Sequence, residues 1–324
     1  MDRQNRKKSN LKVCFVGLGS IAKRHIRNLS KICSEGNIIL TADVYRHGKG
    51  IEMDSETLSF IASQICDFTD VADDYDIIFI TNPTEYHIET LKRFHRKGRH
   101  FFIEKPFCHV NQLRELDLSF LRRDSVYYAA CPLRYSKVIS YVKENICPED
   151  VLSVRSISSS YLPEWRPGID YRNTYSATKS LGGGVSMDLI HEWDYLYYLF
   201  GKPLRVYSML KKVSDLEIDT EDIAVYIGEY ADKIAEVHLD YIGRSPVRKL
   251  ELITREETIV CDFINSRIQY LKQGKTVELE QERNGFQLDE LRYFLNLVQN
   301  CRWEKSNIIE AVRVLSFIQG ETWG

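Results

Sequence analysis

Three ionisable residues in this chain occur in contexts that suit proton transfer. Lys105 lies within Glu104–Pro106, where a proline ends a predicted strand. Asp188 and His191 follow the glycines Gly182–Gly184, and their spacing places both on one face of a predicted helix. Desolvation lowers the pKa of a half-buried lysine, which makes such a group useful for proton transfer near neutral pH. A solvated strand-end lysine and a core histidine are the alternatives, but the combination favours an acid–base site.

A glycine-rich turn, Gly17–Ala22, follows one predicted strand and opens a predicted helix. In this context the first glycine permits a tight turn, Gly19 lets the backbone approach a pyrophosphate, and Ala22 allows close packing of helix on strand. The free amides of the helix N-terminus, including those of Ser20 and Ile21, favour phosphate charge. The motif therefore predicts dinucleotide binding, and a plain strand-to-helix turn is the alternative.

Two charged residues near the end of the next predicted strand bear on the choice of dinucleotide. Asp43 lies about twenty residues after the turn, where a carboxylate accepts hydrogen bonds from the ribose hydroxyls of NAD and repels the 2′-phosphate of NADP. Arg46 follows closely, and an arginine there attracts that phosphate instead. The sequence favours NAD as the cofactor and leaves NADP possible.

Further polar residues end the third and fourth predicted strands, at the sheet edge where doubly wound folds bind ligands. Thr84 is a predicted N-cap of the following helix, and His87 faces either the cofactor or solvent. The predicted cofactor-binding residues at this edge are Thr81, Asn82, Pro83, His87 and Glu104.

The chain from Leu11 to about Tyr128 provides the elements that position these residues. Short β-branched or aromatic runs alternate there with segments of helical period, which indicates βαβ units and a parallel sheet. The predicted strands are Lys12–Val16, Ile38–Val44, Ile77–Thr81, His100–Ile103 and Val126–Ala130, and the predicted helices are Ile21–Lys31, Tyr86–Lys97 and Gln112–Arg122. Gly98 is the predicted C-cap of the second helix. We expect an N-terminal Rossmann domain, a doubly wound parallel sheet, over residues 11–132.

After residue 150 one helix, Gly184–Phe200, is followed by many strands, which indicates an α+β domain built on a largely antiparallel open sheet. The predicted strands are Leu152–Tyr161, Leu204–Lys212, Ile223–Tyr230, Ile234–Tyr241, Lys249–Ile253, Thr258–Cys261, Arg267–Leu271 and Thr276–Leu279. Two closing helices, Phe286–Asn300 and Ile308–Gln319, carry apolar residues at helical spacing and are expected to pack as core, with the first domain as one potential partner. We expect this domain, for substrate binding and oligomerisation, over residues 133–324.

The composition favours a small-molecule partner. The 44 Lys and Arg nearly balance the 46 Asp and Glu, so no net charge favours nucleic acid or a membrane surface. The eight cysteines lack metal-type spacing, so no metal is expected, and reduced thiols suit a cytoplasmic protein. No apolar run approaches the ~20 residues that cross a bilayer. Residues 1–10 are expected to form a flexible basic tail.

Together the motifs resemble the Gfo/Idh/MocA family of oxidoreductases, because Gly17–Ala22, Thr81–Pro83, Glu104–Pro106 and Gly182–His191 follow in the family's order. The resemblance implies a Rossmann domain, a C-terminal α+β domain whose open sheet forms homodimers or homotetramers, a cleft between them, and sugar or polyol substrates. It also implies that Lys105 polarises the reacting hydroxyl, that His191 is the general base, and that Asp188 holds substrate hydroxyls or tunes the pair.

The chain departs from the family pattern in three places. Many members place one more residue between the aspartate and the histidine, and Pro132 stands where many have asparagine, although Arg134 still matches. The segment Tyr161–Arg172 is similar to members from bacterial surface-sugar biosynthesis. There an indole can stack on a sugar ring and an arginine can pair with a carboxylate or phosphate, or the segment can pack on a domain or neighbouring subunit. The predicted substrate-binding residues are Arg134, Trp165, Arg166 and Tyr171.

Three functions are compatible with these residues. The first is NAD(P)-dependent hydride transfer at a secondary alcohol or ketone of a sugar or polyol, which can be acidic, phosphorylated or nucleotide-linked. The second is a redox-neutral elimination or glycoside cleavage through transient oxidation, in which no NADH accumulates. The third is a catalytically silent NAD-binding regulator, which would not require Lys105, Asp188 and His191 together.

Overall fold

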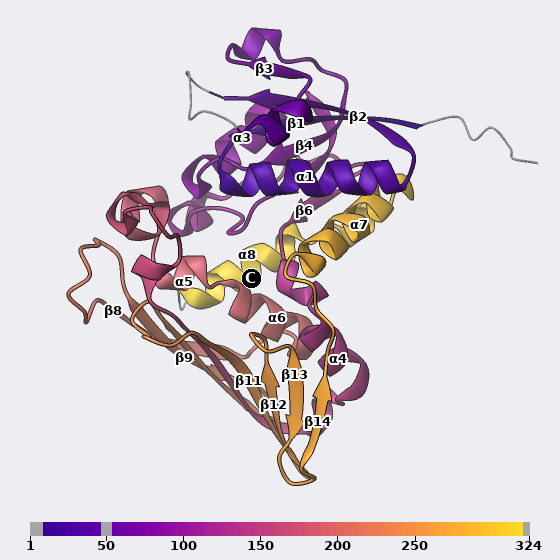
Figure 1. The fold of residues 1–324 in the computed structure, drawn as a ribbon. Helices are drawn as coiled ribbons and strands as arrows, with labels where there is room; N and C mark the ends of the chain where they lie inside the picture. The colour runs from indigo at the N-terminus through magenta and orange to yellow at the C-terminus, as the bar shows by residue number, and fades with distance from the viewer. Residues whose placement is uncertain (1–8, 47–53, 320–324) are drawn as a thin grey trace, which may run out of the picture. The chain divides into compact units, whose positions relative to one another are not determined.

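The computed structural model describes residues 9–46 and 54–319, which divide into two compact units (Figure 1). Unit 1 comprises Met1–Cys108, Glu115–Ala130 and Gln287–Ile308, and unit 2 comprises the remaining segments, His109–Arg114, Cys131–Phe286 and Ile309–Gly324. Of the predicted basic tail, residues 1–8 lie outside the described residues. Ser9 and Asn10 belong to the first strand, because they pair with the second.

Unit 1 contains a six-stranded sheet in the order β3-β2-β1-β4-β5-β6, and every neighbouring pair is parallel. Its strands are β1 (Ser9–Val16), β2 (Ile38–Tyr45), β3 (Ser63–Ile65), β4 (Tyr75–Ile80), β5 (Gly98–Ile103) and β6 (Tyr127–Ala129). The strand order reverses between β1 and β4, which is the switch point where ligands bind in such sheets. The predicted Rossmann topology is confirmed.

Helices cover both faces of this sheet. They are α1 (Ser20–Glu35), α2 (Ser55–Ser59), α3 (His87–Phe94) and α7 (Gly285–Gln299). On one face the rings of Phe15, Phe79, Phe102 and Tyr128 lie in a row across four strands, with centroids 4.5–5.5 Å apart, and Phe294 of α7 packs against three of them. The closing helix α7 therefore belongs to the core of unit 1.

Three local predictions for this part of the chain are wrong. Gly98 begins β5 instead of capping a helix, because it pairs with Tyr75 of β4, and a Cβ at this position would collide with Ile78. The predicted helix Gln112–Arg122 is only a 3-10 segment, Val110–Glu115, followed by turns. Thr84 does not cap α3, since it starts the 3-10 turn Thr84–Tyr86 that precedes the helix.

Unit 2 is built on an eight-stranded sheet in the order β14-β13-β12-β11-β7-β10-β9-β8, in which only β7 and β10 pair in parallel. The strands are β7 (Val151–Ser159), β8 (Arg205–Lys211), β9 (Ile223–Glu229), β10 (Ile234–Asp240), β11 (Val247–Thr254), β12 (Thr258–Asp262), β13 (Arg267–Tyr270) and β14 (Lys275–Glu278). Its helices are α4 (Lys137–Asn145), α5 (Val185–Asp188), α6 (His191–Phe200) and α8 (Ile308–Ile318). The predicted α+β domain with a mostly antiparallel sheet is confirmed.

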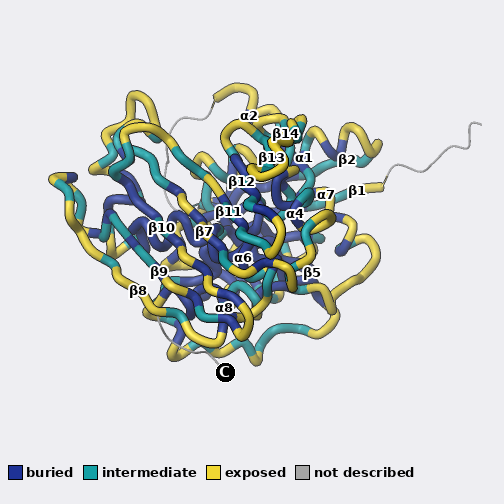
Figure 2. The backbone as a smooth tube through the Cα atoms, turned by 90° about the horizontal axis from the view of Figure 1, so that it is seen from below, coloured by how far each residue is buried: buried dark blue, intermediate teal, exposed yellow. Residues whose placement is uncertain are grey.

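The two faces of this sheet differ in burial. Side chains on one face, such as Tyr226 and Leu250, are completely buried, and Tyr226 packs on Trp193 of α6. The opposite face leaves large apolar side chains exposed, among them Tyr207, Met209 and Ile227. Figure 2 shows the edge strand β8 in the colours of exposed and intermediate residues. The sheet is therefore open on one side.

The helix predicted over Gly184–Phe200 is interrupted, and that prediction is wrong. Helix α5 ends at Asp188, Leu189 adopts φ −100° and ψ 20°, and α6 begins at His191. The amide of Glu192 donates to the carbonyl of Leu189, which is the tighter spacing of a 3-10 turn. Asp188 and His191 therefore lie at the ends of two short helices instead of on one helix face.

Candidate functional site

The glycine-rich turn has the geometry of an anion site. Gly17 adopts φ +90°, and a Cβ there would lie 2.9 Å from the backbone of Asn82, so a glycine is required. Gly19 has an ordinary extended conformation, φ −79° and ψ −175°, and a Cβ there would meet nothing within 4 Å. The protein fold does not require glycine at position 19. The remaining physical reason for a glycine at position 19 is the open space that it leaves for a ligand.

The first turn of α1 offers amide donors to that space. The first hydrogen bond of the helix runs from the amide of Lys23 to the carbonyl of Gly19, so the helix does not use the amides of Ser20 and Ile21. No acidic side chain lies in this first turn, and no side chain caps it. The positive end of the helix dipole therefore faces a site where phosphate charge is favoured.

The neighbouring strand ends are fastened to this turn. The amide and hydroxyl of Thr81 each donate to the carbonyl of Val16, at 3.0 Å, and the hydroxyl also lies 3.0 Å from the carbonyl of Gly17. The side-chain amide of Asn82 donates to Thr90, whereas its Oδ1 is buried without a hydrogen-bond partner in the part of the chain that the structure describes. Thr81 thus supports the turn, and Asn82 presents an unsatisfied acceptor that a ligand can use.

A pocket of about 530 Å³ opens beside the turn, within unit 1. The lining residues come from the ends of β1, β2 and β4 and from α3: Val16, Gly17, Tyr45, Arg46, Asn82, Pro83, Tyr86, Glu89, Thr90, Arg93 and Phe94. Its volume lies in the range of small-molecule and cofactor sites. The predicted residues Gly17, Asn82 and Pro83 are brought together here, and these features fit a dinucleotide.

Asp43 does not line that pocket. It lies two residues before the end of β2, where one carboxylate oxygen accepts from the Tyr75 hydroxyl at 2.8 Å and the other accepts from Ser63 at 2.9 Å. Arg46, at the end of the strand, does line the pocket, and its Nε is buried without a hydrogen-bond partner among the described residues. The structure therefore gives Asp43 a role inside the sheet and leaves Arg46 beside the pocket.

Lys105 follows β5, and the residue before it is held in place. The Glu104 amide continues the ladder by donating to Ile80, and its carboxylate lies 2.5 Å from Nε2 of His25 on α1. Burial alone would raise the pKa of Glu104, but the hydrogen bond and positive charge of His25 outweigh burial and lower it. Lys105 itself is half-buried. Glu104 thus anchors the backbone that carries Lys105.

His87 connects two of these loops. Its Nδ1 lies 3.0 Å from the carbonyl oxygen of Pro106, and its Nε2 lies 2.8 Å from that of Asn82. The ring is buried, and burial lowers its pKa. Both ring nitrogens therefore face backbone carbonyl groups, and His87 joins the loop after β4 to the loop after β5.

In unit 2, Asp188 is held by a tyrosine. The hydroxyl of Tyr241, a residue that is completely buried directly after β10, donates to the Asp188 carboxylate at 2.6 Å. Burial and then the negative charge of Asp188 raise the Tyr241 pKa well above its usual value, so the phenol keeps its proton as the donor. The carboxylate of Asp188 is fixed by this contact.

His191 lies against an arginine and a carboxylate. A terminal guanidinium nitrogen of Arg248, on β11, contacts Nε2 of His191. The Nε of Arg248 lies 2.9 Å from Oε1 of Glu192, so the two groups form an ion pair. The angle between them does not meet the geometry of a hydrogen bond. Glu192 is completely buried, and its other oxygen accepts from Tyr195 at 2.5 Å and from Ser156 at 3.1 Å. His191 therefore has a fixed polar environment on the helix-covered face of the sheet.

Arg134, a predicted substrate ligand, is occupied inside unit 2. Two of its nitrogens donate to the carboxylate of Asp194, at 2.7 and 2.9 Å, and the third donates to Glu310 at 2.8 Å. Burial opposes the charge, but these carboxylates raise the pKa of Arg134 well above its usual value. Because all three nitrogens donate to carboxylates of these two helices, Arg134 links α6 to α8.

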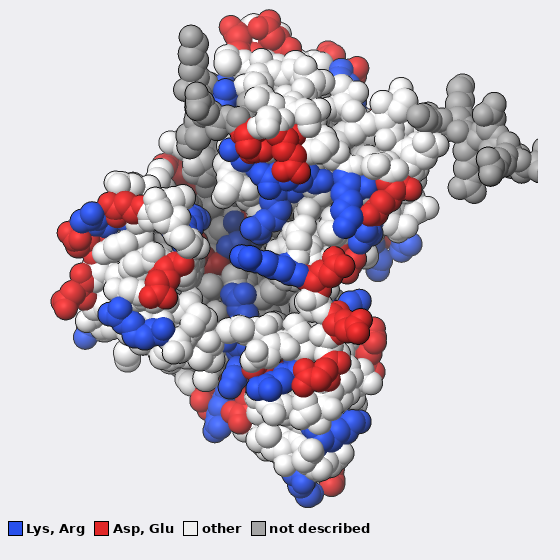
Figure 3. Space-filling view, in the orientation of Figure 1, with Lys and Arg blue, Asp and Glu red and all other residues white. Residues whose placement is uncertain are grey.

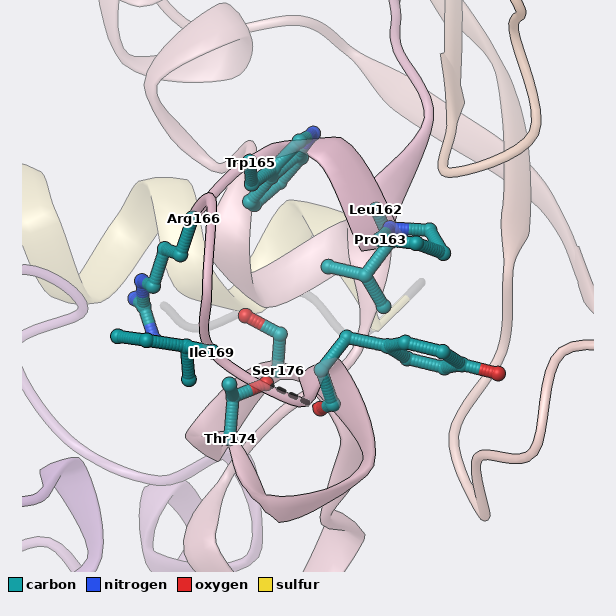
Figure 4. Close-up of a pocket in the computed structure, with 8 residues that line it drawn as sticks. Leu162, Pro163, Trp165, Arg166, Ile169, Thr174 and Ser176 are labelled. Atoms are coloured by element: carbon teal, nitrogen blue, oxygen red, sulfur yellow. Dashed lines mark hydrogen bonds between the residues drawn. The ribbon is translucent and has the colours of Figure 1, made fainter.

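The segment Tyr161–Arg172, called the tryptophan loop below, packs on its own unit (Figure 4). The indole of Trp165 donates to Ser160 at 2.9 Å and meets the ring of Tyr241 edge-on, with centroids 5.2 Å apart. The pocket that Trp165, Arg166 and Tyr171 help to line has a volume of about 10 Å³, enough for about one water molecule and not for a sugar ring. Arg166 is exposed, whereas the hydroxyl of Tyr171 accepts from the amide of Glu217.

Three residues that position the candidate groups were not predicted: Tyr241, Arg248 and Glu192. Tyr241 and Arg248 lie on or beside strands and carry no motif. Glu192 had a visible signal, because it is a carboxylate next to His191 in an otherwise apolar segment. A buried charge requires a partner, so Glu192 could have directed the search toward an arginine.

Charge and hydropathy place few further limits on partners. Figure 3 shows both acidic and basic side chains on the visible face, with basic ones gathered around α1, where Arg27 pairs with Asp54 and Glu56. Within residues 9–46 and 54–319, no helix is long and apolar enough to cross a membrane. The same residues contain no cluster of three or more His, Cys, Asp or Glu side chains suited to a metal ion.

Comparison with known proteins identifies the family. Residues 11–129 match the model of an oxidoreductase family with an NAD-binding Rossmann fold, Gfo/Idh/MocA, and residues 150–260 match a Gfo/Idh/MocA C-terminal domain. The chain is also 30% identical over 196 residues to the uncharacterised oxidoreductase YrbE of Bacillus subtilis. That match covers 58% of this chain and 53% of the relative, so it spans only about half of the relative's length.

Two solved structures show the same fold. A levoglucosan dehydrogenase in complex with NADH has a TM-score of 0.80 at 17% identity, over 96% of each chain. The UDP-N-acetylglucosamine 3-dehydrogenase of Acidithiobacillus ferrooxidans has a TM-score of 0.75 at 18% identity, also over 96% of each chain. Together with the two family matches, which cover more than half of the sequence, these findings show that the chain belongs to the Gfo/Idh/MocA family of oxidoreductases, with an NAD-binding Rossmann domain.

Proposed function

We propose that this oxidoreductase transfers a hydride between a nicotinamide dinucleotide and a secondary alcohol or ketone of a sugar or polyol. One observation carries the proposal: Asp188 and His191, in the segment after the three glycines, are each held by a side chain from another part of unit 2, Tyr241 and Arg248. Such dedicated support is typical of groups that must be oriented for chemistry. Two proteins of the same fold are described as dehydrogenases of sugars.

Lys105, Asp188 and His191 are the proposed catalytic residues. When bound, the nicotinamide supplies the acceptor or donor of the hydride. The chain must bind and orient the reacting hydroxyl and control its proton. We assign the proton to the pair Lys105 and His191, and hydrogen bonds to neighbouring substrate hydroxyls to Asp188. In the turn after β1, Gly17, Gly19, Ser20 and Ile21 are assigned to the pyrophosphate.

The identity of the dinucleotide depends on Arg46 more than on Asp43. Asp43 does not line the pocket, and each of its oxygens accepts a hydrogen bond inside the sheet, so this arrangement favours a structural role for the carboxylate. Arg46 has a buried Nε that a ribose or phosphate oxygen can satisfy. We therefore propose that this chain, within a family defined by NAD binding, also accepts NADP.

The tryptophan loop bears on the charge of the substrate. Arg166 is exposed on the tryptophan loop, and a guanidinium there suits a carboxylate or phosphate on the sugar. Trp165 is already packed against Tyr241, which argues for a supporting role of the indole instead of direct stacking on the substrate. We propose an acidic, phosphorylated or nucleotide-linked sugar.

The open face of the eight-stranded sheet suits association with a second copy of the chain. Tyr207, Met209 and Ile227 expose 54%, 71% and 39% of their surface on neighbouring strands of this face. An exposed apolar face of this kind is typical of an oligomer interface. We propose a cytoplasmic homodimer or homotetramer that uses this face.

A substrate screen tests the reaction class. The purified chain is incubated with NAD or NADP and a panel of neutral, acidic, phosphorylated and nucleotide-linked sugars, and both reduced nicotinamide and sugar products are measured. The proposal predicts that an oxidised sugar and reduced nicotinamide appear in equal amounts. A changed sugar without net reduced nicotinamide would instead show a redox-neutral elimination or cleavage. Cofactor binding without any reaction across the panel would indicate a regulator.

A further inference from the structure

The contact between Arg248 and His191 restricts the protonation state of the imidazole. A guanidinium has hydrogen-bond donors and no acceptor, so the Nε2 that it contacts must present a lone pair. An imidazolium, or a neutral ring protonated on Nε2, would place two N–H groups against each other. The arrangement is therefore compatible only with a neutral ring whose proton is on Nδ1.

The neighbouring carboxylate keeps the guanidinium in this place. Oε1 of Glu192 lies 2.9 Å from Nε of Arg248 and 3.6 Å from Nε2 of His191. Burial raises the pKa of Glu192, and the charge of Arg248 and the hydroxyls of Tyr195 and Ser156 act against that rise. The ion pair balances the charge next to the imidazole. Without Arg248, a buried carboxylate would face Nε2 and favour a proton there.

The strand register explains why this arginine reaches the ring. Arg248 pairs with Ser158 of β7 and lies two residues before the buried Leu250, so both side chains lie on the helix-covered face of the sheet. Arg155 pairs with Glu251 and lies on the open face, where it forms ion pairs with Glu236 and Glu251. The two arginines thus share one sheet, and only Arg248 contacts the candidate site.

We propose that Arg248 is a positioning residue that fixes His191 as the neutral tautomer with its proton on Nδ1. The inference rests on the proposed function for its meaning in catalysis, because it narrows the role of His191 within the proton-handling pair. The contact keeps the Nε2 lone pair of His191 unprotonated before the reaction, as the role of His191 in the proton-handling pair requires.

Nitrogen NMR of the full chain with ¹⁵N-labelled histidine tests the proposal directly. The His191 ring signals are assigned by their loss in a His191→Gln variant. We expect a neutral ring with an unprotonated, downfield Nε2 and a protonated, upfield Nδ1. In Arg248→Met, we expect Nε2 to move upfield as it gains a proton. Arg155→Met is the matched control and should leave the His191 signals unchanged.

The wild-type spectrum alone can overturn the proposal, even if Arg248→Met does not fold. A His191 ring that is protonated on Nε2 at neutral pH would contradict it, as would an unchanged spectrum in a folded Arg248→Met variant. The ring signals are independent of turnover. If the substrate screen failed but His191 showed the expected tautomer, only the proposed function would be rejected. If the screen succeeded but the tautomer differed, only the role of Arg248 would be rejected.

Discussion

Replacing Gly19 with serine should separate cofactor binding from stability. Gly19 is the N-cap of α1 and has an extended conformation, and a Cβ at this position would meet no protein atom within 4 Å. Serine is a good N-cap, and its hydroxyl accepts a hydrogen bond from an amide one turn into the helix. For a cap at position 19 these amides are those of Ile21 and Ala22, and Ile21 is a proposed donor to the pyrophosphate. The substitution therefore improves the cap while it fills the anion site.

The two effects have opposite signs and different sizes. A better cap and a less flexible unfolded chain should together raise the free energy of unfolding by about 0.5–1 kcal/mol. Loss of one hydrogen bond to a charged phosphate costs roughly 1.5–3 kcal/mol of binding free energy, which is about a 10- to 150-fold weaker affinity. The serine side chain adds a steric cost in the same direction.

Two assays on the same preparations measure these effects. Urea unfolding gives the free energy of unfolding, and fluorescence titration with NADH gives the dissociation constant. Gly17→Ala is the contrasting variant, because a Cβ at Gly17 meets the backbone of Asn82 and should weaken both folding and binding. If Gly19→Ser bound NADH as tightly as the wild type, the pyrophosphate would not lie at this turn, and the reasoning would be refuted.

Three further predictions concern the cofactor pocket, acid sensitivity and assembly. Asp43→Asn should lower the free energy of unfolding by about 1–3 kcal/mol, because it disturbs the hydrogen bond of the buried Tyr75 hydroxyl, and should leave the ratio of NADH to NADPH affinity unchanged. Arg46→Ala should weaken the binding of NADPH selectively. A changed affinity ratio in Asp43→Asn, measured by titration, would contradict this assignment. Burial lowers the pKa of His100 to about 4, whereas the unfolded chain binds this proton near pH 6.5. The free energy of unfolding, measured with urea, should therefore fall by up to about 3 kcal/mol as the pH is lowered from 6.5 to 4. His100→Asn should lose this contribution. Met209→Glu should reduce the molar mass measured by light scattering, and an unchanged mass would exclude the open sheet face as the interface.

Local features of the sequence were sufficient for the turn and the sheet of unit 1. The conformations of Gly17 and Gly19 follow from residues within one strand–helix junction, and the buried strands were recognisable as short apolar runs. The parallel topology followed because helical segments separate these strands. The same logic missed β3, Ser63–Ile65, which has only three residues and little apolar content.

The partners of individual charged groups could not be predicted, because they come from distant parts of the chain. Arg134 looked available for a substrate, yet its partners Asp194 and Glu310 lie 60 and 176 residues away in sequence. Asp43 has the sequence position of a ribose ligand, and the structure adds hydrogen bonds from Tyr75 and Ser63 that the sequence did not indicate. Sequence spacing identifies which groups can react, and the tertiary structure decides which of them are already satisfied.

The interruption between α5 and α6 is a similar case. Apolar periodicity continues through the segment, so one helix was expected. The chain instead turns at Leu189, and Asp188 and His191 are then fixed by Tyr241 and Arg248 from strand regions more than fifty residues later. Local propensity did not contain this information, because long-range polar contacts select the break.

Deuterium transfer measures directly whether this chain moves a hydride between nicotinamide and a sugar. NADH or NADPH deuterated at nicotinamide C4 is incubated with the full chain and a panel of keto-sugars, and mass spectrometry measures deuterium in the sugar alcohols. The account predicts that one deuterium is transferred to a sugar product and that Lys105→Ala lowers the rate by ~10²–10⁴ while NADH binding persists, as expected for a positioned acid–base group. Transfer at the wild-type rate by a folded Lys105→Ala variant would contradict the account.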